Sequence, residues 1–229
     1  MNAKALERAS VLLFDFGGTL DSDGIPWKTR FFRIWQDEVG EIAPAVFDRA
    51  FYDADDAVVG HVAAQTPLAE TVGRVARGLV HELRRRADEE LAERIATRFL
   101  ADAKERLSSS AVLLKRLSRR YRLGIVSNFY GNLEAVCRES GIAPHLSVAI
   151  DSTAVGFRKP DARIFQAALA PLDTAASDAI FVGDSLPRDM AGARAIGMPH
   201  VWLSTGEGPC CCPEDPVIRS LAGLEEILA

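Results

Sequence analysis

A short apolar run that ends in an acid, two glycines and a hydroxyl constrains this chain more than any other stretch. It covers residues 11–20, VLLFDFGGTL. The run is short and its flanks are polar, which favours a buried β-strand over a helix. Asp15 then stands at the carboxyl end of that strand, where open α/β sheets bind their ligands. Gly17 and Gly18 allow the backbone to turn sharply there and to approach a ligand closely.

Further strand-like and helix-like segments alternate in the second half of the chain. The sequence predicts strands over 123–128, 147–150, 179–184 and 200–203, and helices over 111–117, 133–140, 161–169 and 190–196. Such alternation is typical of an α/β fold, and we expect a Rossmann-like, doubly wound parallel sheet.

Residues 27–107 follow a different pattern. Their apolar residues recur at helical spacing, for example Val72, Val75 and Leu79, and no strand-like run interrupts them. We therefore predict an all-helical inserted domain over residues 21–108 and a core domain formed by residues 1–20 and 109–229.

The composition limits the partners that we expect. The chain has 229 residues, of which 48% are hydrophobic, so it can form a real core. Its net charge of −5 offers no electrostatic basis for binding nucleic acid. No apolar run approaches the roughly 20 residues of a membrane span, and residues 1–10 hold no apolar stretch typical of a secretory signal. We therefore expect neither a nucleic-acid partner nor a membrane.

The four cysteines favour a reducing compartment. Cys137 stands alone, and Cys210, Cys211 and Cys212 are adjacent, so the sequence lacks the spacing of a disulfide framework. No histidine or further cysteine stands near the triplet at zinc-ligand spacing, which favours thiols in a loop over a metal site. A cytoplasmic location is the simplest expectation.

Acidic and polar residues end three of the predicted strands. Asp15, the pair Ser127 and Asn128, and Asp184 stand at these ends, and Asp189 follows shortly after Asp184. Because parallel strands end at one edge of the sheet, these groups should converge. Several carboxylates in one crevice repel one another unless a cation joins them. A hard divalent ion, Mg²⁺ above all, suits such oxygen ligands.

The remaining polar groups of these motifs suit a phosphate. Lys159 can add a positive charge. Hydrogen bonds to phosphate oxygens can come from Thr19, Ser127, Asn128 and the Gly17–Gly18 backbone. Acids, a metal, a lysine and donors in one crevice favour phosphoryl transfer over the binding of a neutral ligand.

Four ordered motifs, DFGGTL, VSN, RKPD and VGDSLPRD, resemble those of the haloacid dehalogenase-like (HAD) hydrolase superfamily. The helical insert between the first two motifs is similar to that family's C1-type cap. The resemblance implies that Asp15 is a nucleophile that forms an aspartyl-phosphate, with Ser127 and Lys159 holding the phosphoryl group. It also implies that Asp184 binds Mg²⁺ together with Asp15 and that Asp189 acts in the same site. The expected function is a Mg²⁺-dependent phosphatase of a small phosphorylated metabolite.

One position departs from the family pattern. Family phosphatases carry a second Asp two residues after the nucleophile, where it protonates the leaving group and later activates water; here that position is Gly17. Glycine keeps the backbone carbonyl that the family uses as a metal ligand, so the metal site should survive. Loss of the acid–base group costs about 10²- to 10⁴-fold in rate. Good leaving groups should suffer least, and Asp21 or Asp23 in the next turn is the substitute acid that the sequence offers.

Three other functions stay open. A carbon-centred hydrolase such as a dehalogenase also lacks the second Asp but needs no metal, and the presence of Asp184 and Asp189 argues against it. A phosphonate-cleaving enzyme uses a cap lysine to form a Schiff base with the substrate. The candidate lysines of the insert are Lys28 and Lys104. A binding or regulatory protein that keeps the phosphate site without turnover is supported by Gly17 alone.

Overall fold

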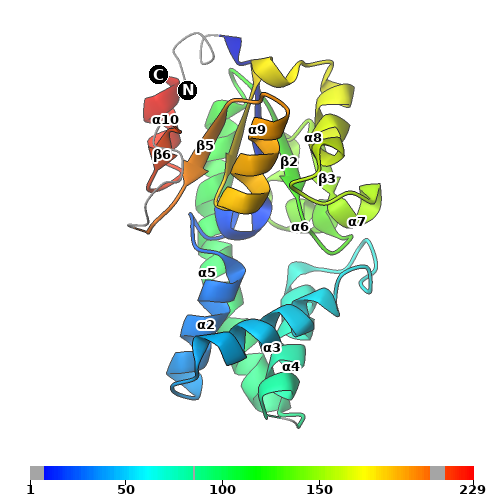
Figure 1. Cartoon of the computed structure of the whole chain (residues 1–229), viewed down its shortest axis with the longest axis vertical. Helices are drawn as coiled ribbons and strands as arrows, with labels where there is room; N and C mark the ends of the chain where they lie inside the picture. Colours follow the sequence, from blue (N-terminus) through cyan, green and yellow to red (C-terminus); the bar gives the residue numbers. More distant parts are fainter. Residues whose placement is uncertain (1–7, 85, 207–214) are drawn as a thin grey trace.

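A six-stranded parallel sheet forms one layer of the molecule (Figure 1). The computed structural model describes residues 8–84, 86–206 and 215–229. The strand order is β3-β2-β1-β4-β5-β6, and every neighbouring pair is parallel, which confirms the predicted Rossmann-like sheet. The strands are β1 (Val11–Phe14), β2 (Arg122–Ser127), β3 (Val148–Asp151), β4 (Ala179–Gly183), β5 (His200–Leu203) and β6 (Val217–Ile218).

Helices cover both faces of this sheet and form a second layer beside one end of it (Figure 1). Two short irregular turns, η1 (Phe16–Leu20) and η5 (Leu186–Met190), follow β1 and β4. The helices are α2 (Trp27–Glu38), α3 (Pro44–Asp56), α4 (Leu68–Arg84), α5 (Glu89–Leu117), α6 (Leu133–Glu139), α7 (Ser152–Val155), α8 (Ala162–Leu169), α9 (Ala191–Ala195) and α10 (Gly223–Leu228).

The two faces of β1 are buried against different helices. Leu12 and Phe14 belong to one apolar cluster with side chains of α5, α6 and α10, whereas Val11 and Leu13 belong to another with α8 and α9. Alternate residues of a strand point to opposite faces. A strand that is covered on both faces therefore needs the uninterrupted apolar run that opens this chain.

The predicted helical insert is present as α2, α3, α4 and α5, between η1 and β2. Its interior is aromatic: the rings of Phe31 and Phe99 stack with centroids 4.6 Å apart, and Trp27 lies edge-on to Phe99 at 4.8 Å. Residues 111–117 are helical as predicted, but they form the last turns of α5, which runs unbroken from Glu89 to Leu117, and not a separate helix. The hydroxyls of Ser108, Ser109 and Ser110 donate to backbone carbonyls and leave the helix intact. The exact division at 20/21 and 108/109 stays a proposal.

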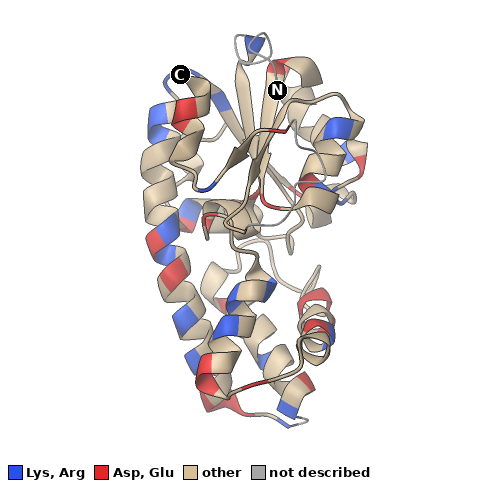
Figure 2. Ribbon diagram, turned by 60° about the vertical axis from the view of Figure 1, so that its left-hand side comes forward, with Lys and Arg blue, Asp and Glu red and all other residues tan. Residues whose placement is uncertain are grey.

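Charged residues of both signs are interspersed along the outer helices (Figure 2). No helix within the described ranges is both long and apolar enough to cross a membrane. Cys137 on α6 is a buried thiol, and burial raises its pKa to about 12. The predicted loop with Cys210, Cys211 and Cys212 lies outside the described residues.

The order of the strands also places the functional site. The chain builds the sheet outward from β1 in both directions, so that β2 and β4 flank it. Ligands of such sheets bind beyond the carboxyl ends of the strands at this reversal. Three of the four motifs singled out in the sequence lie at the ends of β1, β2 and β4, and the fourth, RKPD, lies between α7 and α8.

Candidate active site

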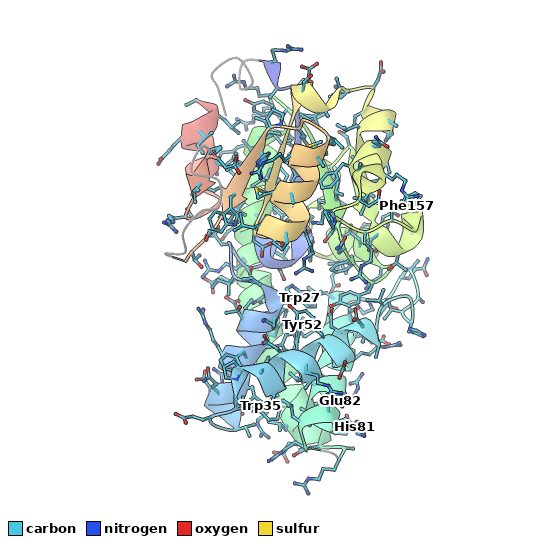
Figure 3. The ribbon with its side chains drawn as sticks, viewed as in Figure 1. Trp27, Trp35, Tyr52, His81, Glu82 and Phe157 are labelled. Atoms are coloured by element: carbon cyan, nitrogen blue, oxygen red, sulfur yellow. The ribbon has the colours of Figure 1, made fainter. Side chains whose placement is uncertain are left out.

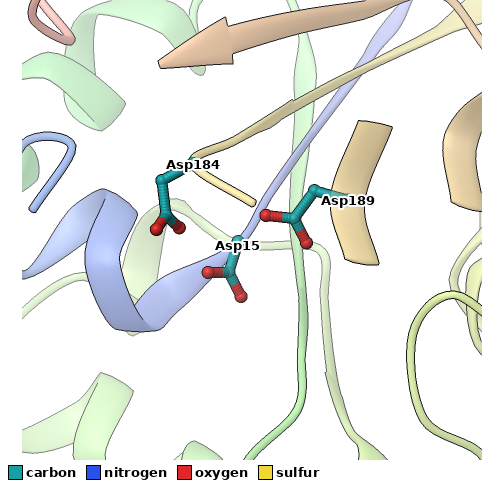
Figure 4. A group of neighbouring side chains, drawn as sticks. All are labelled: Asp15, Asp184 and Asp189. Atoms are coloured by element: carbon teal, nitrogen blue, oxygen red, sulfur yellow. The ribbon is translucent and has the colours of Figure 1, made fainter. Parts of the chain in front are cut away.

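Three carboxylates meet where β1 and β4 end (Figure 4). Asp15 follows β1, Asp184 follows β4 and Asp189 lies in η5. Each offers an oxygen, and these oxygens lie within 4.8 Å of one another. Burial and the charges of Asp15 and Asp189 raise the pKa of the Asp184 carboxyl well above its usual value. A cation would remove this repulsion, and a donor set made of oxygen alone fits a hard divalent ion.

Lys159 joins two of the three carboxylates. Its Nζ lies 2.6 Å from Oδ1 of Asp15 and 2.7 Å from Oδ1 of Asp189. Burial opposes the charged ammonium group, but the two carboxylates outweigh burial and raise the pKa of Lys159. Ser127, at the end of β2, donates to the same oxygen of Asp15 at 2.9 Å. Because both donors hold one oxygen, the Asp15 carboxylate has a fixed orientation.

Asn128 fixes the loop that carries Lys159. Its Oδ1 accepts the backbone N–H of Lys159 at 2.7 Å, and its Nδ2 donates to the carbonyl of Lys159 at 3.1 Å. The side chain also lines the cavity described below. The predicted contact of Asn128 with the substrate stays a prediction. The sequence did not reveal its hydrogen bonds to the backbone of Lys159.

Gly18 and Thr19 have other partners than the phosphate that we expected. The N–H of Gly18 donates to Oδ1 of Asp21 at 2.8 Å, and the fully buried Thr19 hydroxyl donates to Oδ1 of Asp184 at 3.2 Å. Both hydrogens are used inside the protein in this structure. Their predicted contact with a phosphate stays a prediction.

The indole of Trp27 lies where a side chain at position 17 would begin. A Cβ built on Gly17 would be 3.2 Å from Nε1 of Trp27. Trp27 is the first residue of α2 and lies at the junction of the helical insert and the sheet layer (Figure 3). Its Nε1–H donates to Oδ2 of Asp21 at 2.6 Å. An aromatic ring therefore occupies the surroundings of the missing acid.

The structure does not support Asp21 or Asp23 as the substitute acid. Asp21 is fully buried and pairs with the buried Arg30 at 3.0 Å, in addition to Trp27. Burial raises the pKa of Asp21, and Arg30 opposes this rise. The Asp23 carboxylate accepts the backbone N–H of Leu221 at 2.5 Å. The expectation was wrong because both acids have structural partners, and neither lines the cavity.

A cavity of about 370 Å³ extends from the three carboxylates toward the helical insert. Its volume suits a small-molecule substrate. The core contributes Asp15, Gly17, Ser127, Asn128, Lys159, Asp184 and Asp189, and α2 and α3 contribute Trp27, Lys28, Thr29, Phe51, Tyr52 and Asp55.

Sequence reasoning missed Asp55 and Tyr130, which both line this cavity. Asp55 is one of three acids near the end of α3, with Asp53 and Asp56, and such a group is typical of a solvated helix face. Asp55 differs from Asp53 and Asp56 only in that the packing of α3 places it in the lining of the cavity. No sequence signal could have found it.

Comparison with known proteins identifies the family of this fold and site. A family model described as "Hydrolase: haloacid dehalogenase-like hydrolase" matches residues 9–197. The chain belongs to the haloacid dehalogenase-like hydrolases. Membership accounts for the four ordered motifs and for the acidic cluster at the edge of the sheet.

Curated relatives within this family match about half of the chain. Haloacid dehalogenase-like hydrolase domain-containing protein 3 of Bos taurus is 36% identical over 110 residues, or 48% of this chain and 42% of that protein. Phosphoserine phosphatase of Thermus thermophilus is 34% identical over 121 residues, or 53% of this chain and 42% of that protein. The matches thus span less than half of each relative.

A solved HAD structure agrees over nearly the whole chain. It is the HAD-hydrolase YfnB from Bacillus subtilis bound to magnesium, with a TM-score of 0.61 and 23% identity, covering 96% of this chain and 99% of that one. At this identity the likeness concerns the fold.

Proposed function

We propose that this HAD-like hydrolase is a Mg²⁺-dependent phosphatase of a small phosphorylated metabolite, with Asp15 as nucleophile. The observation that carries the proposal is the contact set at the cavity floor. There Lys159 bridges Asp15 and Asp189, and Asp184 completes a cluster of three oxygens within 4.8 Å. A cluster of anions beside one buried cation suits a transferring phosphoryl group and a divalent ion.

In this proposal the residues act in two steps. The Asp15 carboxylate attacks phosphorus while the bond to the leaving oxygen breaks, which gives an aspartyl-phosphate. Water then attacks that phosphorus, and inorganic phosphate and the free carboxylate result. Lys159 and Ser127 hold the reacting groups through the contacts seen at Asp15.

The residues present fit the metal that the family implies. Asp15, Asp184 and the carbonyl of Gly17 would hold Mg²⁺, and Asp189 would act beside them directly or through water. The bound ion supplies positive charge that offsets the charge of the phosphoryl oxygens.

The proposed division into two domains places the catalytic groups in the core and the cover of the site in the insert. Residues 1–20 and 109–229 would form the catalytic core, and residues 21–108 would form a cap that covers the leaving group. In support, α2 and α3 of the insert line the cavity. The phosphatase relative named above also favours a small phosphorylated substrate. The cysteine usage favours a cytoplasmic setting.

Phosphonate cleavage through a Schiff base is less well supported. Of its two candidate lysines, Lys28 lines the cavity, but its Nζ is engaged in an ion pair with Asp48 at 2.7 Å. Lys104 lines a different hollow, between α4, α5 and α6. Chemistry at carbon without a metal gives no role to the Asp184 carboxylate.

The test is hydrolysis of a panel of alkyl, aryl and acyl phosphates with Mg²⁺ and with chelator, beside Asp15→Asn. We expect Mg²⁺-dependent turnover that Asp15→Asn abolishes. Turnover of these esters that persists in chelator would contradict the proposed Mg²⁺ dependence, and absence of turnover would leave chemistry at carbon or a binding role. No turnover of any ester, together with binding of phosphate or a metallofluoride, would favour the binding protein instead.

A further inference from the structure

The cavity holds one carboxylate that the proposed mechanism does not use. Among the described residues that line it, Asp55 is the acid outside the Asp15, Asp184 and Asp189 cluster. Asp55 is half-buried near the end of α3, on the insert side of the cavity. A leaving group that extends from the three carboxylates toward the insert would enter the part of the cavity that α3 lines.

Tyr130 fixes this carboxylate. The buried Tyr130 hydroxyl donates a short hydrogen bond to Oδ1 of Asp55. The Tyr130 ring in turn packs against Trp27, with centroids 5.8 Å apart, and Trp27 adjoins Gly17. The ring that adjoins Gly17 thus packs against the tyrosine that holds a carboxylate in the same cavity.

We infer that Asp55 is the general acid and base that replaces the Asp missing at position 17, with Tyr130 as its positioning residue. The inference rests on the proposed phosphatase function. It assigns to the insert a proton-transfer role that family phosphatases give to the core.

In the first step Asp55, in its carboxylic acid form, gives its proton to the leaving oxygen directly or through one water, as the bond from that oxygen to phosphorus breaks and Asp15 bonds to phosphorus. The leaving group departs as an alcohol, and Asp55 becomes a carboxylate. In the second step that carboxylate takes a proton from the water that attacks the aspartyl-phosphate, which restores Asp55.

The surroundings of Asp55 favour the protonated form that the first step needs. Burial raises the pKa of Asp55, and the neighbouring Asp56 adds to the rise. The Tyr130 hydrogen bond, Arg158 and Arg188 lower it and only partly offset burial. Turnover of alkyl phosphates should therefore fall as the pH rises through this pKa, because the acid is lost. Tyr130→Phe removes a bond to the carboxylate and should move the descending limb to higher pH.

The test compares leaving groups in Asp55→Asn and in the control Asp56→Asn, an exposed neighbour on the same helix that does not line the cavity. We expect Asp55→Asn to lose about 10²- to 10⁴-fold in kcat on alkyl phosphates. On aryl phosphates with acidic phenols, which leave without a proton, the loss should stay below about tenfold. Asp56→Asn should change both by less than about threefold. A steeper dependence of rate on leaving-group pKa in Asp55→Asn alone supports the inference.

A metal-free measurement checks the same assignment without turnover. Carboxyl ¹³C NMR of the protein, assigned with Asp55→Asn, should show Asp55 titrating above its usual range, and Tyr130→Phe should raise that pKa further. An Asp55 that titrates in the usual range overturns the inference. So does an equal loss on aryl and alkyl esters, which would make Asp55 a substrate-binding residue. Absence of wild-type turnover on every ester would instead overturn the proposed function, and the inference with it.

Discussion

At the scale of single residues, the two glycines that follow Asp15 have different structural roles. Gly17 has an ordinary φ of −78°, and what limits a side chain there is the indole of Trp27. Gly18 has a φ of +99°, which L side chains rarely adopt, and a Cβ there would lie 2.6 Å from Oδ2 of Asp184. Only glycine at position 18 lets the Asp184 carboxylate take its place in the cluster.

Gly18→Ala should therefore weaken both the fold and the metal site. The strained backbone costs about 1–2 kcal/mol in the free energy of unfolding. Displacement of Asp184 should weaken Mg²⁺ binding by about 10- to 100-fold, the usual cost of disturbing the support of a metal ligand. Calorimetric titration with Mg²⁺ and urea unfolding measure the two effects.

Gly40→Ala is the matched control for this change. Gly40 has a φ of +115°, and a Cβ there would meet nothing within 4 Å. It should show the backbone cost alone, with unchanged Mg²⁺ affinity. Equal Mg²⁺ affinities in the two variants would contradict the argument from the Asp184 contact.

At the scale of elements, helix α5 connects the insert to the core. It has 29 residues and runs from the insert to the face of the sheet (Figure 1). Where it crosses between them, Ser110 donates to the carbonyl of Leu20 at 2.7 Å and is buried. Ser109 is exposed and donates to the carbonyl of Glu105 in the same helix. Ser110 thus joins α5 to η1, whereas Ser109 does not.

Ser110→Ala should lower the free energy of unfolding by about 1–3 kcal/mol, because the buried Leu20 carbonyl loses its donor. Ser109→Ala should change it by less than about 0.5 kcal/mol, as is usual for surface positions. Urea unfolding of the two variants under one condition measures the difference. Equal effects would mean that the contact with η1 adds no stability.

The elements were predictable where a periodic pattern or a turn signal marked them. The runs that became β1, β2, β3, β4 and β5 carry such marks, whereas the two-residue β6 is too short to show any. The proximity of Asp15 and Asp184 could be predicted from the sequence because parallel strands end at one edge of the sheet. Asp55 could not, because its place over the cavity depends on how the insert packs. The partners of Gly18 likewise follow from backbone angles that no pattern encodes.

At the scale of the whole molecule, the acidic cluster makes the folded state sensitive to the metal. In the metal-free protein, burial of carboxylates that repel one another destabilises the folded state, in line with the raised pKa of Asp184. An ion that binds only the folded state adds stability in proportion to the logarithm of its concentration over Kd. Stability should therefore report metal binding without any substrate.

We expect Mg²⁺ at 100 times its Kd to add about 2.7 kcal/mol, which corresponds to a rise of about 5–10 °C in Tm for a chain of this size. Asp184→Asn should lose this rise, while its metal-free Tm should equal or exceed that of the parent because repulsion is relieved. Asp48→Asn, which removes the half-buried ion pair with Lys28, should keep the full rise. Differential scanning calorimetry with Mg²⁺ and with chelator measures all three, and a rise that survives in Asp184→Asn would place the ion elsewhere.

Because α5 is one unbroken helix, a bend where it meets the core would rotate the insert about that point. Residues 89–107 of this helix span about 28 Å at 1.5 Å per residue. A bend of about 5° at the serines would carry the far end through about 2 Å of arc, whereas the residues beside the bend would hardly move. Hydroxyls that donate to carbonyls one turn back are known to ease such bends. A small bend of α5 between the core and the insert would then displace α2 and α3, which line the cavity, by distances on the ångström scale.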